Sequence, residues 1–321
     1  MTRPVRSLML AGSAVLVLLA ACATPETVVE VPAVASPAND YAQLMDDVRV
    51  LSADDMEGRD TGAAGGERAR AYIVSRLEAL GVQPASFGRL QPFEATGRTR
   101  EGPKTFNGVN ILGLIPGTAV ADRYIVVTAH YDHVGMSGGQ TYNGADDNAS
   151  GVATMLELAK RLKAAPPRHS VLIVALDGEE RGLLGAREFV KAPPVPLASM
   201  ALNINYDMTA RPETDGHLWV TGTYQTPALR PILDPVAPVG AVSLAFGKDT
   251  PQDTGENNWV NSSDHAAFKD ANVPFLYFGV DYHPDYHRPS DDFERITPAV
   301  FQNATEIAIN AFVALDAALD R

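Results

Sequence analysis

A short apolar run that ends in acidic residues is the feature of this sequence that most limits its possible folds. Residues 171–176, VLIVAL, are followed at once by Asp177, Glu179 and Glu180. A run this short, rich in β-branched residues and closed by Asp-Gly, is typical of a strand buried on both faces inside a parallel sheet. Ligands of such sheets gather at the carboxyl ends of the strands. The acidic end of this strand is therefore a candidate site, whereas an isolated Glu-Glu pair could equally be a solvated turn.

Strands and helices alternate along the rest of the chain. Apolar periodicity predicts helices over residues 40–51, 66–80, 149–162 and 301–319. Short β-rich runs predict strands over residues 109–115, 124–128, 170–176, 200–205, 218–221, 242–246 and 274–278. This alternation predicts an α/β fold, in which helices cover both faces of a mostly parallel sheet.

The first 21 residues are typical of a secretory signal. Arg3 and Arg6 precede an apolar run over residues 8–19, which is too short for a comfortable membrane span, and Leu-Ala-Ala-Cys follows. That last segment resembles the lipobox of bacterial lipoproteins, in which the cysteine becomes the lipidated first residue. Residues 22–39 carry three prolines among small residues and are interpreted as a flexible tether. We therefore expect a signal peptide at 1–21, a tether at 22–39 and one catalytic domain at 40–321.

The cysteine count and the net charge exclude two classes of protein. Cys22 is the only cysteine of the 321 residues, so a scaffold of internal disulfides is excluded. The formal net charge is −13, and removal of residues 1–21 with their two arginines makes it −15. An acidic surface of this size argues against nucleic acid as a partner.

Polar side chains with metal-binding chemistry follow several predicted strands. They are His130, Asp132 and His133 after 124–128, Asp146 and Asp147 before the helix at 149, Glu179 and Glu180 after 170–176, Asp207 after 200–205, and Tyr286 and His287 after 274–278. Each has a structural interpretation alone, such as a helix cap or a hydrogen-bonded core histidine. Because the strands would deliver them to one edge of the sheet, we expect them to converge.

Imidazole and carboxylate ligands without thiolate suit zinc in a catalytic role, because such sites leave a position open for water. One ligand from each of these five segments gives two histidines and three carboxylates, which is more than one three-ligand site needs. They suit two zinc ions that share a bridging carboxylate and lie roughly 3.5–4 Å apart.

Six motifs, in order, carry a family resemblance: TAHYDH, NGADDNASG, LDGEERGLLG, NYDM, SDHAAF and YHRPSD. Between about residues 55 and 292 the chain resembles the di-zinc aminopeptidases of peptidase clan MH. That family includes the secreted bacterial leucyl aminopeptidases and, more distantly, glutamate carboxypeptidase and glutaminyl cyclase. The resemblance implies a three-layer αβα sandwich, the phosphorylase/hydrolase-like zinc exopeptidase fold. Residues 86–105 are too few to hold an inserted protease-associated domain.

The resemblance also implies roles for individual residues. It assigns His130 and Asp207 to one zinc ion and Glu180 and His287 to the other, with Asp146 as the bridge. Glu179 would be the general base, Tyr286 would donate a hydrogen bond to the oxyanion, and a cis peptide would join Asp146 to Asp147. The resemblance also implies that Asp132 and Asp264 orient His130 and His287 respectively. The remaining histidines are interpreted as structural or surface residues: His133, His169, His217, His265 and His283, the last of which lies four residues from a predicted ligand.

The expected activity is zinc-assisted hydrolysis of an N-terminal peptide bond, with Glu179 passing a proton from water to the leaving amine. Three alternatives stay open: glutaminyl cyclisation on one zinc ion, carboxypeptidase or dipeptidase action, and a binding module without chemistry. We expect peptides with a free N-terminus as substrates, a monomer, and a lipid anchor on Cys22. Ala23 after that cysteine resembles the sorting signal for the outer membrane, with the enzyme facing the periplasm. The preferred N-terminal residue cannot be deduced from the sequence.

Overall fold

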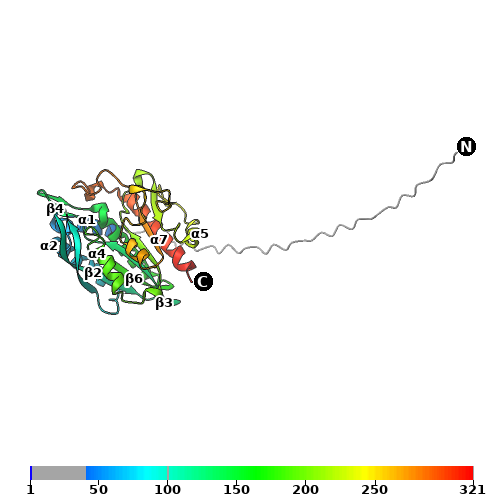
Figure 1. Cartoon of the computed structure of the whole chain (residues 1–321), viewed down its shortest axis with the longest axis horizontal. Helices are drawn as coiled ribbons and strands as arrows, with labels where there is room; N and C mark the ends of the chain where they lie inside the picture. Colours follow the sequence, from blue (N-terminus) through cyan, green and yellow to red (C-terminus); the bar gives the residue numbers. More distant parts are fainter. Residues whose placement is uncertain (2–40, 100, 321) are drawn as a thin grey trace. The chain divides into compact units, whose positions relative to one another are not determined.

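A mixed sheet of eight strands organises the chain (Figure 1). The computed structural model describes residue 1, residues 41–99 and residues 101–320, so the predicted signal, the tether and Cys22 lie outside the described residues. The strand order is β1-β2-β6-β3-β7-β10-β8-β9. The bounds are β1 Leu90–Thr99, β2 Gly102–Ile115, β3 Val120–His130, β6 His169–Leu176, β7 Met200–Tyr206, β8 His217–Thr221, β9 Ser243–Phe246 and β10 Phe275–Gly279.

The centre of the sheet is parallel, and an antiparallel pairing borders it on each side. Strands β6, β3, β7 and β10 run parallel to one another. β2 pairs antiparallel with β6, β8 pairs antiparallel with β10, and β9 pairs parallel with β8. The predicted α/β class with a mostly parallel sheet is therefore confirmed. Strand β1 was not predicted from the sequence, and it forms an antiparallel ribbon with β2 from Leu90↔Ile111 to Thr99↔Gly102. Much of this ribbon is exposed, so it lacks the continuous apolar run by which the central strands were found.

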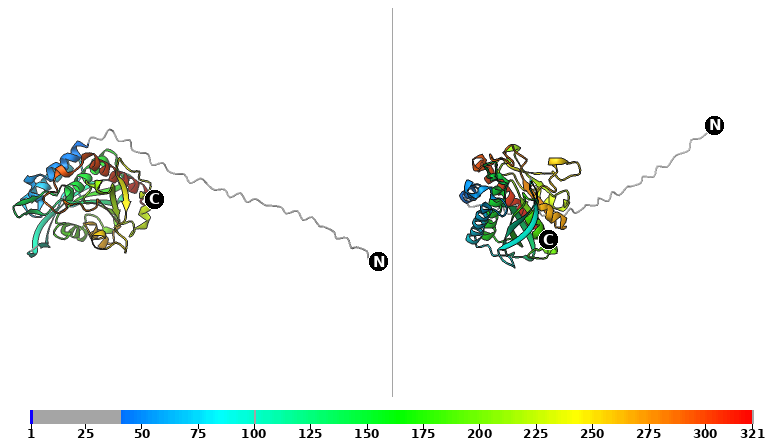
Figure 2. Two further views of the ribbon diagram at one scale, coloured as in Figure 1. Left: turned by 90° about the horizontal axis from the view of Figure 1, so that it is seen from above. Right: turned by 60° about the vertical axis from the view of Figure 1, so that its left-hand side comes forward.

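Helices cover both faces of the sheet (Figure 2). Helices α1 (Ala42–Leu51), α2 (Ala64–Ala79), α3 (Gly151–Ala164) and α7 (Pro298–Ala318) contribute to the core on one face, and α4 (Leu184–Lys191) and α6 (His265–Asp270) to the core on the other. Successive side chains of β3 point alternately into the two cores: Ile125 and Val127 pack in the first, and Val126 packs in the second. This explains the continuous apolar runs at residues 125–127 of β3 and 171–176 of β6.

The remaining elements are short. They include the hairpin of β4 (Gly135–Ser137) and β5 (Gln140–Tyr142), the helix α5 (Arg230–Leu233) and several single-turn helices. In the described part of the chain, no helix combines the length and the apolar character that a membrane span requires.

Register brings the ends of the central strands to one edge. His130, the last residue of β3, lies opposite Leu176, the last of β6. Thr128 of β3 lies opposite Asn205 of β7, and Tyr206 of β7 lies opposite Phe278 of β10. Because these strands are parallel, the segments that leave them begin side by side, as the sequence analysis expected.

The end of α7 is tied to the start of β6 by a buried histidine. The carboxylate of Asp316 accepts hydrogen bonds from the backbone N–H groups of Arg168 (2.8 Å) and His169 (2.9 Å), and it lies 2.8 Å from His169 Nδ1. His169 is fully buried. It is therefore structural, as the sequence analysis proposed, and Asp316 fixes the last helix against the sheet.

Replacing Asp316 by alanine should lower the free energy of unfolding by about 2–4 kcal/mol, because three donors lose their acceptor. The matched control is Asp234→Ala, because the exposed carboxylate of Asp234 pairs with Arg230 and should contribute less than about 1 kcal/mol. Urea unfolding of both variants measures the difference. Equal losses of unfolding free energy in the two variants would contradict the role of Asp316 in fixing α7 against the sheet.

Candidate active site

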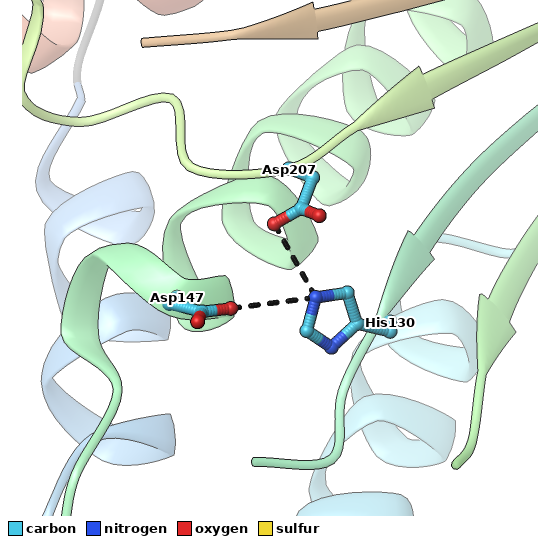
Figure 3. Close-up of side chains that lie close together, drawn as sticks. All are labelled: His130, Asp147 and Asp207. Atoms are coloured by element: carbon cyan, nitrogen blue, oxygen red, sulfur yellow. Dashed lines mark hydrogen bonds and ion pairs between the residues drawn. The ribbon is translucent and has the colours of Figure 1, made fainter. Parts of the chain in front are cut away.

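His130 and two carboxylates form the first of two groups at this edge (Figure 3). Nε2 of His130 lies 3.4 Å from Oδ1 of Asp147 and 3.3 Å from Oδ1 of Asp207. All three residues are buried. They come from the end of β3, the turn before α3 and the residue after β7, so one nitrogen and two oxygens from distant segments converge on one point.

A second group lies on the other side of Asp147. Oδ2 of Asp147 is 3.0 Å from Nε2 of His287, and Oε1 of Glu180 is 3.3 Å from the same nitrogen. His133 also belongs to this group, since its Nδ1 lies 2.8 Å from Oε1 of Glu180. The two oxygens of Asp147 thus face different groups, as a bridging carboxylate would.

The structure contradicts the assignment of Asp146 as the bridge. The carboxylate of Asp146 points away from both groups and accepts hydrogen bonds from Ala210 N–H (2.7 Å) and the Ser150 hydroxyl (3.0 Å), and it lies 3.0 Å from Nε2 of His283. Asp147 takes the predicted position instead. The predicted cis peptide is likewise displaced by one residue, because the cis bond joins Asp147 to Asn148.

His133, interpreted as a structural or surface residue, does not lie at the surface but in the second group of possible ligands. Its side chain is fully buried beside Glu180, and its ring lies 5.8 Å from that of His287. Its spacing of three residues from His130 was the available signal, and the sequence analysis did not use it. The other histidines interpreted as structural have contacts outside the two groups: His217 with Ser243, and His265 with the carbonyl of Trp259.

Asp132 positions three of the candidate residues, which extends its predicted role. The Nδ1 nitrogen of His130 lies 3.1 Å from the Asp132 carbonyl and 3.6 Å from its carboxylate. The same carboxylate accepts the backbone N–H groups of Glu179 (3.1 Å) and Glu180 (3.2 Å). One buried side chain therefore fixes both the end of β3 and the turn after β6.

Asp264 does not occupy its predicted place beside His287. The ring of His287 is held by Asp147 and Glu180, and the two carboxylate oxygens of Asp264 are buried without a hydrogen bond in the described structure. Burial raises the pKa of Asp264 to about 8, and the charge of His130 opposes this rise. Asp264 thus acts electrostatically on the His130 side of the site.

Glu179 lines a small cavity between the acids and a group of tyrosines. The cavity has a volume of about 20 Å³ and also contacts Asp147 and Asp207 on its acidic side. Its aromatic wall consists of Tyr277, Tyr282 and Tyr286. Sequence analysis had found Tyr286 alone. Burial raises the pKa of Glu179 well above its ordinary value, and Glu180 adds to this rise while His130 opposes it.

The histidine and carboxylate pKa values show that the site favours added positive charge. Although burial lowers the pKa of His287, its contacts with Asp147 and Glu180 outweigh this effect and raise that pKa to about 11. Burial also opposes the charge of His130, yet Asp207 and Asp132 raise its pKa well above the usual value. A divalent ion would supply such charge.

Two buried residues missed by the sequence analysis hold the loops that carry the groups. Arg59 donates hydrogen bonds to the carbonyls of Leu51, Tyr131, Asn143 and Gly144. Burial lowers the pKa of Arg59 to about 10, so it stays charged at neutral pH. Asp291 accepts the backbone N–H groups of Asp146 and Asp147, each at 3.0 Å. Asp291 ends the motif YHRPSD, but the resemblance gave it no role, and no composition or spacing signal distinguishes Arg59 from its neighbours.

A second network links three loops through Asp146. Arg211 donates to Nδ1 of His283 (3.2 Å) and to Asp285 (2.6 Å), which leaves the Nε2–H of His283 to donate to Asp146. Arg211 follows Asp207, His283 precedes His287, and Asp146 precedes Asp147. The network therefore connects the backbone segments of three candidate ligands.

The donor set fits zinc. It consists of imidazole nitrogens and carboxylate oxygens, and it includes a buried oxygen, Oε1 of Glu180, without a hydrogen bond in the described structure. Tetrahedral ligands at about 2.0–2.1 Å from an ion lie roughly 3.3 Å apart. The separations of 3.3 and 3.4 Å around His130 and of 3.0 and 3.3 Å around His287 are close to this value.

Comparison with known proteins identifies relatives. Residues 110–312 match peptidase family M28. Aminopeptidase YwaD of Bacillus subtilis (strain 168) is 30% identical over 216 residues, which cover 63% of this chain and 43% of that protein. The probable lipoprotein aminopeptidase LpqL of Mycobacterium tuberculosis (strain ATCC 25618 / H37Rv) is 25% identical over 278 residues, covering 78% of this chain and 53% of that protein. The chain thus spans about half or less of the length of these relatives.

Solved structures share the fold. The zinc aminopeptidase BSAP of Bacillus subtilis superposes with a TM-score of 0.64 at 18% identity, covering 84% of this chain and 94% of that one. Probable glutamate carboxypeptidases and glutaminyl cyclases are also among the similar proteins. The predicted family resemblance, with these more distant relatives, is therefore confirmed.

Single substitutions of the two neighbouring aspartates test whether Asp147, and not Asp146, is the bridging carboxylate. Asp147→Asn should weaken zinc binding by about 100-fold or more, because it removes the charge that faces both groups. Asp146→Asn should keep zinc affinity within about tenfold, yet lower the free energy of unfolding by about 1–3 kcal/mol through its contacts with His283 and Ala210. Chelator competition and urea unfolding provide the two measurements. The reverse pattern would restore Asp146 as the bridge.

Proposed function

Because the chain belongs to peptidase family M28, we propose that it is an aminopeptidase that removes N-terminal residues from peptides with two zinc ions and a glutamate base. The observation that carries this proposal is the pair of histidine and carboxylate groups that share Asp147. His130, Asp147 and Asp207 would hold one ion, and Asp147, Glu180 and His287 the other. Two such ions supply a water of lowered pKa and polarise the substrate carbonyl.

Glu179 is proposed as the general base. It lines the cavity beside Asp147 and Asp207, but it belongs to neither group of possible ligands. Its carboxylate is therefore free to accept a proton from water and to pass it to the leaving amine. Asp132 holds the backbone of both glutamates, so Glu179 can face the cavity while Glu180 faces His287.

Tyr286 is proposed to stabilise the oxyanion. It lines the same cavity, and its ring stacks on that of His287 with centroids 3.9 Å apart. Burial raises the pKa of Tyr286 far above its ordinary value, so its hydroxyl stays protonated and can donate a hydrogen bond. The carboxylates that line the cavity favour a substrate with a protonated amine, which supports peptides with a free N-terminus.

A panel of substrates tests the activity. The zinc-loaded protein should release free amino acids from aminoacyl arylamides and unblocked peptides, and acetylation of the N-terminus should abolish this release. Ammonia release from N-terminal glutamine peptides would indicate glutaminyl cyclisation instead. Cleavage of blocked peptides at the C-terminus would indicate a carboxypeptidase, action on dipeptides alone would indicate a dipeptidase, and no turnover would favour a binding module.

Single substitutions separate the roles of the two glutamates. Glu179→Gln should keep both zinc ions and lose activity by about 10²–10⁴-fold, because proton acceptance and donation fall together. Glu180→Gln should lose zinc from one position, so that excess zinc partly restores activity. Zinc content and turnover of each variant are the measurements. Zinc loss in the first variant with retention in the second would reverse the roles.

We also propose that Cys22 carries a lipid that anchors the protein to the outer membrane, facing the periplasm. The support is the segment Leu19-Ala20-Ala21-Cys22 after a basic and apolar start, together with similarity to a probable lipoprotein aminopeptidase.

Fractionation of cells tests the anchor. The native protein should sediment with outer membranes, and Cys22→Ala should move it to the soluble periplasmic fraction. Ser36→Ala, in the proposed tether, is the control and should leave the distribution unchanged. Membrane association of the Cys22→Ala variant would contradict the anchor.

A further inference from the structure

His133 is the buried residue of the site for which the proposed reaction has no role. Both of its ring nitrogens lack a hydrogen bond within the described part of the chain, and its side chain is fully buried. An imidazole without a partner in such a place is costly, because each buried polar atom loses its bonds to water. Its position therefore requires a partner that the protein itself does not supply.

The ring of His133 faces the same two oxygen atoms as the ring of His287. Nδ1 of His133 lies 2.8 Å from Oε1 of Glu180 and 3.8 Å from Oδ2 of Asp147. Nε2 of His287 lies 3.3 Å and 3.0 Å from these same oxygens. The four separations lie on both sides of the roughly 3.3 Å expected between ligands of one tetrahedral zinc ion.

A simple hydrogen bond between His133 and Glu180 does not explain this arrangement. The two atoms are close enough, but both Nδ1 of His133 and Oε1 of Glu180 remain without an acceptable hydrogen bond. Donor and acceptor are therefore poorly aligned. A nitrogen and an oxygen that are near each other but misaligned are what two ligands of the same ion present.

We propose that His133 is a fourth protein ligand of the ion held by Asp147, Glu180 and His287. This inference rests on the proposed two-zinc function and deepens it. The position at His130 then has three protein ligands and keeps room for water or substrate, whereas the position at His133 is filled by four. Three protein ligands are typical of catalytic zinc and four of structural zinc. The ion at His130 would therefore take the larger part in binding water and substrate, and the ion at His133 would be the more firmly held.

Replacing His133 should therefore weaken one ion and spare the other. Zinc titration of the metal-free protein against a chromogenic chelator should show two ions in the native chain. In His133→Ala, the affinity for one ion should fall by at least about tenfold, and the other should be unchanged. His217→Ala is the matched control, because His217 contacts Ser243 outside both groups.

The native protein provides an independent count of ligands. In the cobalt-substituted chain, three histidines should show hyperfine-shifted imidazole resonances, namely His130, His133 and His287, and two should remain in His133→Ala. This count does not depend on the variant's stability. Two shifted histidines in a native chain that binds two ions would overturn the role of His133 and leave the proposed function intact. A native chain that binds one ion would overturn both.

Discussion

The burial of several carboxylates at one edge of the sheet is the constraint on which the rest of the structure depends. Asp147, Asp207 and Glu180 are largely removed from water, and each would repel the others if nothing compensated their charge. Imidazole rings face these oxygens and offset part of their charge. Asp132 and Asp291 hold the backbone of the loops in place by accepting N–H groups from them. The pKa values of His130 and His287 are raised because the neighbouring carboxylates favour the protonated imidazoles.

Much of the fold could be predicted because its central strands are buried on both faces. Such strands are buried along their whole length and mostly apolar, and the polar residues that follow them mark the site edge. The ribbon of β1 and β2 could not be found in this way. Its residues alternate between exposed and buried, and its pairing depends on a partner strand rather than on its own composition.

The site residues could be predicted to the segment but not always to the residue. Asp146 and Asp147 are adjacent, and the turn before α3 decides which carboxylate faces the histidines. That turn is irregular, since Asp147 and Asn148 depart from helical backbone angles, so neither strand nor helix periodicity applies to it. His133 was missed for a related reason: it lies beyond the end of β3, where alternation no longer tells inward from outward.

The hydrogen bonds of Arg59 limit which fragments of the chain could still form the site. The match to the peptidase family begins at residue 110, which invites the excision of everything before it as a dispensable extension. Yet the guanidinium of Arg59 joins α1 to the carbonyls of Tyr131 and Gly144, next to His130 and close to Asp147. A fragment cut at the family boundary would leave these carbonyls without their donor. The shortest fragment that can form the site therefore begins well before residue 110, where the match to the peptidase family begins.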